Sequence, residues 1–88
     1  MTEYIALINK DTGTDYGVIF PDFPGCVTAG ATVAEAKRMA RETLASHIKI
    51  MKADGIIIPF PSTYAEIMSN PLYRGTLAFE VALPLNIE

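Results

Sequence analysis

Three side chains in this sequence carry chemistry that catalysis uses, and they are Asp22, Cys26 and His47. Asp22 lies in the stretch FPDFPGC, where a carboxylate beside other acids can hold a metal ion for nuclease chemistry. The other acids available for such a centre are Asp11, Asp15, Glu35, Glu42 and Asp54. No pair among them has a recognised metal-binding spacing. We therefore expect Asp22, which lies between prolines, to accept hydrogen bonds from nearby backbone N–H groups and to fix the turn.

Cys26 and His47 are the only cysteine and the only histidine in the chain. A nucleophilic cysteine needs a base, and nothing in the sequence brings these two side chains together. Apolar neighbours at Phe23 and Val27 instead predict a buried, unreactive thiol. His47 lies in an apolar helical stripe, where we expect a hydrogen-bonded core or interface residue, and a second histidine for a zinc site is absent. The sequence predicts no catalytic residue, cofactor or metal ion.

Composition narrows the class of protein further. Eighty-eight residues are typical of one small domain, so we expect a single domain over residues 1–88. Half of the residues are apolar, and surplus apolar surface on a small domain favours self-association or partner docking. The net charge of −3 and the lack of a basic cluster argue against direct nucleic-acid binding. No signal-peptide pattern or membrane-length apolar run is present, which favours a cytoplasmic protein.

Four segments are expected to be strands. Residues 4–9 (YIALIN) are apolar on both faces, which predicts a strand that is either central in its sheet or covered on both faces. A polar turn with Gly13 leads to residues 16–20, and the short gap indicates an antiparallel hairpin. Residues 26–30 are expected to form a short third strand. Residues 77–83 (LAFEVAL) alternate in the manner of a last strand.

The clearest helix signal lies between the third and last of these strands. Thr32 and Glu35 match a capping box, in which each side chain satisfies a backbone N–H group at the start of a helix. The helix is expected to run from Val33 to about Ala53. Gly55 is expected to end it, because glycine readily adopts the left-handed conformation of a helix C-cap.

The apolar stripe of this helix is wider than a core-facing band, so its edge near Met39 and Ile50 is available for a second contact. Prolines in the following IIIPFP exclude a long regular element there. Thr63 and Glu66 predict a second, short helix that ends before Pro71. The predicted fold class is therefore α+β in the order βββααβ, with a three-stranded antiparallel sheet, a long helix, a short helix and a final strand.

Residues 16–36, YGVIFPDFPGCVTAGATVAEA, strongly resemble the HicB-like antitoxin family. That family is marked by an aromatic strand running into P-D-x-P-G-C, a short strand, G-x-T and a helix that opens with E-A. The matching positions here are Pro21, Asp22, Pro24, Gly25, Cys26, Gly30, Thr32, Glu35 and Ala36. The later Gly55 and the IPFPS segment of residues 58–62 resemble a second family feature, so the resemblance covers about residues 4–68.

This resemblance implies a partial RNase H-like fold without a nuclease centre. It also implies the antitoxin of a type II toxin–antitoxin system, which binds and sterically neutralises a HicA-like mRNA-cleaving toxin and forms a homodimer or homotetramer. Many family members add a C-terminal DNA-binding module. The sequence ends at Glu88, just after the last expected strand, so we expect either a short member or an N-terminal domain without that module.

Partner binding is assigned at this point to Asp22, Phe23, Pro24, Met39 and Ile50. The proline-rich loop either borders a partner surface or is a purely internal turn. Two alternatives to the antitoxin remain open: a self-assembling oligomerisation domain of a transcriptional repressor, and a minimal metal-dependent nuclease that uses Asp22.

Overall fold

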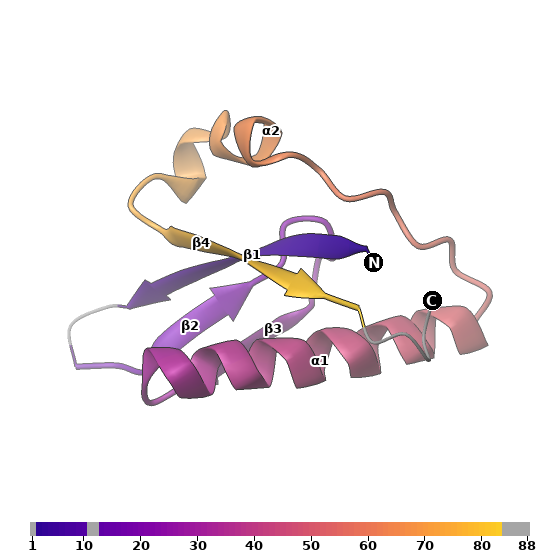
Figure 1. Cartoon of the computed structure of the whole chain (residues 1–88), viewed down its shortest axis with the longest axis horizontal. Coiled ribbons are helices and arrows are strands. Elements are labelled where there is room, and N and C mark those ends of the chain that lie inside the picture. The colour runs from indigo at the N-terminus through magenta and orange to yellow at the C-terminus, as the bar shows by residue number, and fades with distance from the viewer. Residues whose placement is uncertain (1, 11–12, 84–88) are drawn as a thin grey trace.

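The computed structural model describes residues 2–10 and 13–83. They form one four-stranded antiparallel sheet with helices on both of its faces (Figure 1). The elements in chain order are β1 (Glu3–Lys10), β2 (Tyr16–Ile19), β3 (Val27–Gly30), α1 (Val33–Ala53), α2 (Tyr64–Met68), the 3-10 helix η1 (Pro71–Tyr73) and β4 (Leu77–Ala82). The strand order is β3-β2-β1-β4. The predicted α+β class is confirmed, and two details are new: η1, and the position of the last strand beside β1.

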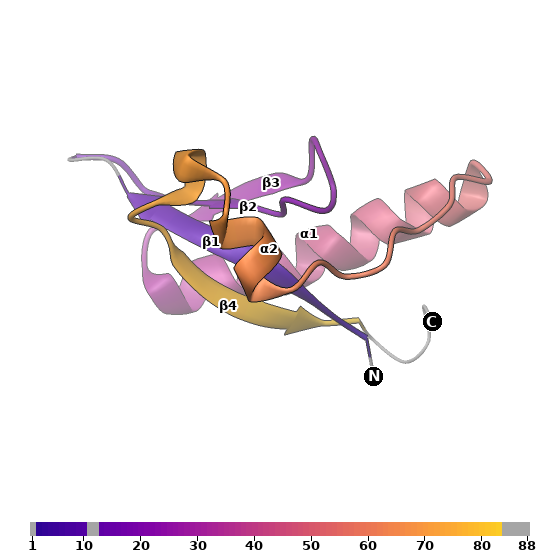
Figure 2. The ribbon, with the colours of Figure 1, turned by 90° about the horizontal axis from the view of Figure 1, so that it is seen from above.

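The central strand β1 is apolar on both faces because both faces are covered. Tyr4, Ala6 and Ile8 belong to the main core, which also contains the buried residues of α1. Ile5 and Leu7 point to the opposite face and pack with Ile67 of α2 and with part of η1. Figure 2 shows this layering from above, with α2 over β1 and α1 beneath the sheet.

Helix α1 starts and ends where its capping residues predict. The Thr32 hydroxyl accepts a hydrogen bond from the Glu35 backbone N–H at 3.0 Å. Gly55 follows the helix with φ +70°, and its N–H bonds to the Lys52 carbonyl at 3.1 Å. The stripe of the helix that faces the sheet consists of Ala36, Ala40, Leu44 and Ile48.

Small residues let α1 approach the sheet closely at its first turn. A Cβ atom at Gly30 would lie 2.4 Å from the backbone nitrogen of Ala36, so only glycine fits there. The helix therefore meets β3 at backbone-contact distance. No helix within residues 2–10 and 13–83 is both long and apolar enough to cross a membrane.

Between α1 and α2 the chain runs for residues 55–62 without regular structure, and we call this segment the strap. Its sequence is GIIIPFPS, and its prolines account for the missing helix and strand. In Figure 1 the strap crosses from the C-terminal end of α1 to α2, on the far side of the sheet. It therefore links the two helical layers.

Candidate partner-binding site

A pair of hydrogen bonds joins the proline-rich loop to the strap, and we call this contact the clasp. One carboxylate oxygen of Asp22 accepts a bond from the Ser62 backbone N–H at 2.8 Å, and the other accepts from the Ser62 hydroxyl at 2.6 Å. Both residues are partly buried. Charge-assisted bonds of this length are about twice as strong as neutral ones. The clasp fixes the strap to a loop that lies 40 residues earlier in the chain.

The expectation that Asp22 bonds local N–H groups is therefore wrong. The loop is closed by its own backbone, through bonds from Phe23 N–H to the Phe20 carbonyl and from Cys26 N–H to the Phe23 carbonyl, both at 2.9 Å. Gly25 adopts φ +87°, which allows the tight turn. The Asp22 carboxylate is then free to reach the strap. The two residues of the clasp lie in the two sequence motifs, P-D-x-P-G-C and IPFPS, but nothing in the sequence indicated that these motifs contact each other.

The strap has a second anchor on β1. The Tyr4 hydroxyl donates a hydrogen bond to the Pro59 carbonyl at 2.5 Å. The Tyr4 ring packs edge-on against Phe23 with centroids 4.7 Å apart, and Phe23 in turn lies 5.9 Å from the ring of His47. Tyr4 and Phe23 together thus connect the loop, the strap, β1 and α1.

Phe23 is 1% exposed, so its side chain lies in the core and is not a surface contact as we expected. The other residues assigned to partner binding lie apart from one another. Pro24 is exposed in the loop, Met39 is partly buried on α1, and Ile50 is 62% exposed near the end of α1. They do not form a single patch around Asp22, and their role in binding stays a prediction.

The surroundings of Asp22 and Cys26 do not favour a catalytic role for either side chain. Asp15 and Asp22 lie at opposite ends of β2, so the strand separates them. Asp11 lies outside the described residues. Across residues 2–10 and 13–83, no group of three or more His, Cys, Asp or Glu side chains is arranged to hold a metal ion. Burial raises the pKa of the Cys26 thiol to about 11, which leaves almost no thiolate at neutral pH.

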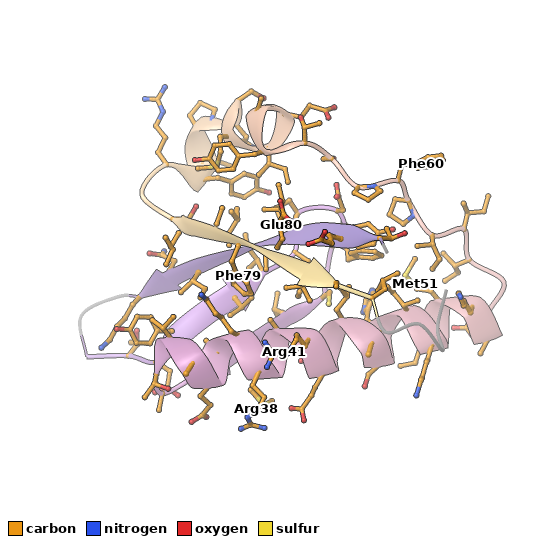
Figure 3. All side chains as sticks on the ribbon, viewed as in Figure 1. Arg38, Arg41, Met51, Phe60, Phe79 and Glu80 are labelled. Atoms are coloured by element: carbon orange, nitrogen blue, oxygen red, sulfur yellow. The ribbon has the colours of Figure 1, made fainter. Side chains whose placement is uncertain are left out.

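The strap presents bulky apolar side chains to solvent. Phe60 is 96% exposed and Ile57 is 89% exposed, although both belong to a segment that is held at Pro59 and Ser62. Figure 3 shows Phe60 projecting outward from the strap. Large apolar groups that are exposed on an anchored backbone are typical of protein–protein interfaces. We call Ile57 and Phe60 the strap face.

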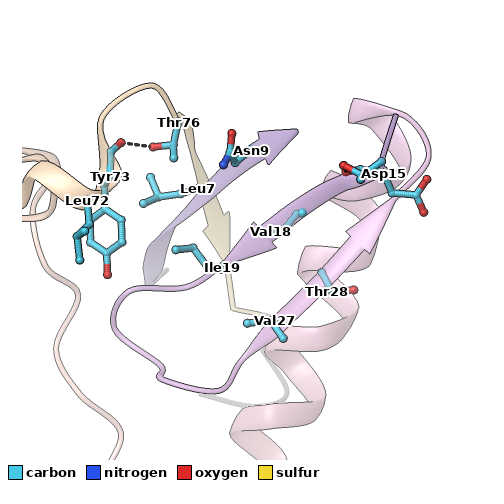
Figure 4. A pocket seen from close by; sticks show the side chains of 12 residues that line it. Leu7, Asn9, Asp15, Val18, Ile19, Val27, Thr28, Leu72, Tyr73 and Thr76 are labelled. Atoms are coloured by element: carbon cyan, nitrogen blue, oxygen red, sulfur yellow. Dashed lines mark hydrogen bonds between the residues drawn. The ribbon is translucent and has the colours of Figure 1, made fainter. Parts of the chain in front are cut away.

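A second apolar surface lies on the sheet, where α2 and η1 leave β2 and β3 uncovered. It is a groove of about 480 Å³ with Leu7, Ile19 and Val27 in its floor and Leu72 and Tyr73 of η1 along its side (Figure 4). The Thr76 hydroxyl bonds to the Tyr73 carbonyl at 2.6 Å and closes the loop that follows η1. Sequence reasoning missed this groove because periodicity does not tell which strands a short helix will cover.

The described residues thus form a small α+β domain that has a buried thiol, a structural aspartate and two exposed apolar surfaces. The family model described as the HicB_like antitoxin of bacterial toxin–antitoxin systems matches residues 4–86. The chain belongs to this HicB-like antitoxin family, which confirms the expectation from its motifs.

Solved structures agree with this assignment. The antitoxin HicB of Burkholderia pseudomallei is 32% identical with a TM-score of 0.88, over 99% of this chain and 67% of that one. Its isolated N-terminal domain is 29% identical with a TM-score of 0.80, over 96% of this chain and 100% of that one. A chain of a HicA3–HicB3 toxin–antitoxin complex is 27% identical with a TM-score of 0.78, over 94% of this chain and 99% of that one.

One curated relative matches as well. It is a 14.9 kDa protein from the rep–hol intergenic region of Haemophilus phage HP1, strain HP1c1, and it is 33% identical over 70 residues. The match covers 80% of this chain and 53% of that protein. The chain thus spans about half the length of this relative.

Proposed function

We propose that this chain is the antitoxin of a type II toxin–antitoxin system and that it neutralises a HicA-like, mRNA-cleaving toxin by covering it. The observation that carries the proposal is its likeness to a chain of a solved toxin–antitoxin complex, 99% of which it covers. The match extends through the whole of that chain, so the part of the molecule present in that complex has its counterpart here.

Neutralisation by contact, without enzymatic chemistry, is the mode that the site supports. Asp22 is engaged in the clasp and Cys26 is buried with a raised pKa, so the two most chemically capable side chains serve the fold. The site of action is the cytoplasm, where a toxin that cleaves mRNA meets its substrate. Protein and toxin would meet there without a cofactor.

The strap face is the part of the surface that we assign to the toxin. Its two side chains are more exposed than any other large apolar side chain among the described residues. The anchors at Pro59 and Ser62 hold the backbone before binding, so little entropy is lost when the surface is covered. An acidic chain of net charge −3 also suits a basic, RNA-binding partner.

The test is an RNA-cleavage assay with a purified HicA-like toxin. Cleavage should fall as antitoxin is added and should stop at a fixed molar ratio. A doubly substituted strap variant, Ile57→Asp with Phe60→Asp, should bind roughly 700-fold more weakly or worse, because buried hot-spot side chains cost about 2 kcal/mol or more each. Leu72→Asp is the matched control, since Leu72 is similarly exposed on η1.

Two results would count against these assignments. Undiminished cleavage at excess antitoxin would refute the antitoxin function itself. If inhibition survives in the strap variant but is lost in Leu72→Asp, the toxin-binding surface would be the groove on the sheet and not the strap face. Both variants change surface residues, so their folding should match the parent within about 0.5 kcal/mol.

A further inference from the structure

Helix α1 carries five of the seven basic residues of the chain. At about 100° per residue, all five fall within a sector of about 120° on one side of the helix. We call this side the basic flank, and it consists of Lys37, Arg38, Arg41, Lys49 and Lys52. The two acids of the helix, Glu35 and Glu42, lie just outside the sector. The flank is therefore a row of one sign of charge, about 21 Å long from Arg38 to Lys52.

Most charges of the basic flank face solvent without an opposite charge beside them. The exposed members are Arg38, Arg41, Lys49 and Lys52. Lys37 is half-buried, with its ammonium group 5.5 Å from the centre of the Phe79 ring. Among residues 2–10 and 13–83, Arg38 alone of the five is in an ion pair, with Glu42 at 3.4 Å. Figure 3 shows Arg38 pointing away from the sheet. Four cations are thus available to a ligand.

An ordinary solvent-exposed helix face has a different pattern. Such faces mix both signs of charge, often as pairs three or four residues apart. Positions 38, 41, 45, 49 and 52 follow one another at that spacing and form one continuous row, which no acid interrupts. The helix dipole favours Lys49 and Lys52 near the C-terminal end of α1. It does not account for Lys37, Arg38 and Arg41 in the first half of the helix.

The basic flank becomes visible only when the helix is formed. The sequence has no basic cluster longer than two residues, and this argued against nucleic-acid binding. The helix gathers residues that are up to 15 positions apart onto one side. A ligand there responds mainly to charges within about 8 Å, the screening length at physiological ionic strength, so the local charge counts more than the net charge of −3.

We propose that the basic flank binds the phosphate backbone of single-stranded RNA. A protein partner would need apolar anchors. Ile50, the exposed large apolar side chain of α1, lies on the opposite side of the helix. Exposed pairs of lysine with carboxylate also contribute little affinity. A nucleic acid gains affinity without apolar contact, because each cation that meets a phosphate releases a counterion from the strand.

The shape of the basic flank selects a single strand. The cations form one straight row on a convex helix, which a flexible strand can follow phosphate by phosphate. Most single-stranded nucleic acid in a cell is RNA, so RNA is the source to which we assign the flank. Because the row holds no aromatic side chain on which a base could stack, binding should depend on the backbone and not on base sequence.

Salt dependence measures how many phosphates are contacted. The assay is fluorescence anisotropy of a labelled oligouridine titrated with the isolated chain. Four available cations predict that the logarithm of the affinity falls against the logarithm of the salt concentration with a slope of about −3. The affinity should therefore fall about ninetyfold between about 20 and 100 mM salt. An affinity that is independent of salt would overturn the proposal.

A pair of variants with equal net charge locates the binding site. Arg41→Gln with Lys49→Gln removes two exposed cations from the row and keeps good helix-forming residues. The slope should fall to about −1.4, and binding in about 20 mM salt should weaken more than about a hundredfold. Lys10→Gln with Arg74→Gln removes the two basic residues outside α1, which are also exposed. It should leave the affinity within about twofold of the parent.

A third variant should strengthen binding. Glu42→Gln removes the carboxylate that pairs with Arg38 and so makes a fifth cation available. The slope should steepen by about 0.7, and the affinity in about 20 mM salt should rise about fifteenfold. A row of cations with a purely structural role would give no such gain.

The proposal does not depend on the toxin, because every measurement uses the isolated chain and synthetic RNA. An equal loss of affinity in the Lys10–Arg74 variant would overturn it, since overall charge alone would then explain binding. So would a lack of RNA binding in low salt. Tighter binding of a polyglutamate peptide than of oligouridine would also overturn it and would indicate an acidic protein as the partner. Thermal unfolding verifies the fold of each variant, and if the Arg41–Lys49 variant fails to fold, Glu42→Gln decides.

Discussion

Removing the clasp should destabilise the whole domain. Asp22→Ala deletes both bonds to Ser62, one to its backbone N–H and one to its hydroxyl. A hydrogen bond to a charged group contributes about 1.5–3 kcal/mol, and the lower end applies because both residues are only partly buried. The expected loss is about 2–4 kcal/mol. That is a large share of the roughly 4–13 kcal/mol expected for a chain of this length.

Substitution of Ser62, the partner of Asp22, shows how much of this loss comes from each hydrogen bond. Ser62→Ala removes only the hydroxyl bond and should cost about 1–2 kcal/mol, while the backbone N–H still reaches Asp22. The double variant should cost less than the sum of the two single variants, by about 1 kcal/mol or more, because the two side chains touch. Asp15→Ala removes an equal charge from an exposed site and should change stability by less than about 0.5 kcal/mol.

Urea unfolding gives the free energies, and amide hydrogen exchange locates the change. Exchange at the Ser62 amide should speed up in Asp22→Ala before the amides of α1 respond, because the strap opens first. An unchanged urea midpoint together with unchanged exchange at Ser62 would refute the structural role of Asp22. Magnesium-dependent RNA cleavage that is lost in Asp22→Asn would instead revive the nuclease alternative.

Three further predictions concern packing and titration. Gly30→Ala should cost about 1–3 kcal/mol or more in urea unfolding, because its Cβ would meet the α1 backbone at 2.4 Å, whereas Gly17→Ala meets only a carbonyl at 3.7 Å and should cost less. Cys26, with its pKa raised to about 11, should be alkylated at least about a hundredfold more slowly in the folded chain than in urea, and equal rates would contradict its burial. A hydrogen bond with Glu3 and the Glu3 charge raise the pKa of Glu80, so the folded state holds that proton more tightly than the unfolded chain. The stabilisation that this shift gives the folded state is complete at pH values below the ordinary glutamate pKa, and it is lost as pH rises through the raised pKa of Glu80. The melting temperature should therefore fall over that pH range, and Glu80→Gln should make the fall smaller.

Local signals predicted the helices well. Thr32 and Gly55 bracket α1 at its observed ends, and the Thr63–Glu66 capping box is present with both of its hydrogen bonds. Each of these signals depends on residues within one turn of the helix end, so the sequence alone contains the relevant physics. The apolar character of β1 on both faces predicted a strand that is either central or covered on both faces, and in the structure it is both.

Features that depend on distant contacts were not predictable in this way. Asp22 had several plausible hydrogen-bond partners nearby, and only the folded chain brings Ser62 within 2.8 Å of it. Phe23 was assigned to partner binding because it is an apolar side chain in a proline-rich loop, yet tertiary packing places it between Tyr4 and His47. The groove exists because a helix of five residues, α2, covers only part of the second sheet face.

The residues that hold the strap in place are different from those that can contact a partner. Asp22, Ser62 and Tyr4 fix the backbone through hydrogen bonds, whereas Ile57 and Phe60 are so exposed that the core gains little from them. Substituting a holding residue should therefore lower stability and partner affinity together. Substituting Ile57 or Phe60 should change affinity alone, because a surface side chain contributes little to folding. The proline-rich loop fixes the segment that carries these exposed side chains, and under the proposed function it would serve binding indirectly.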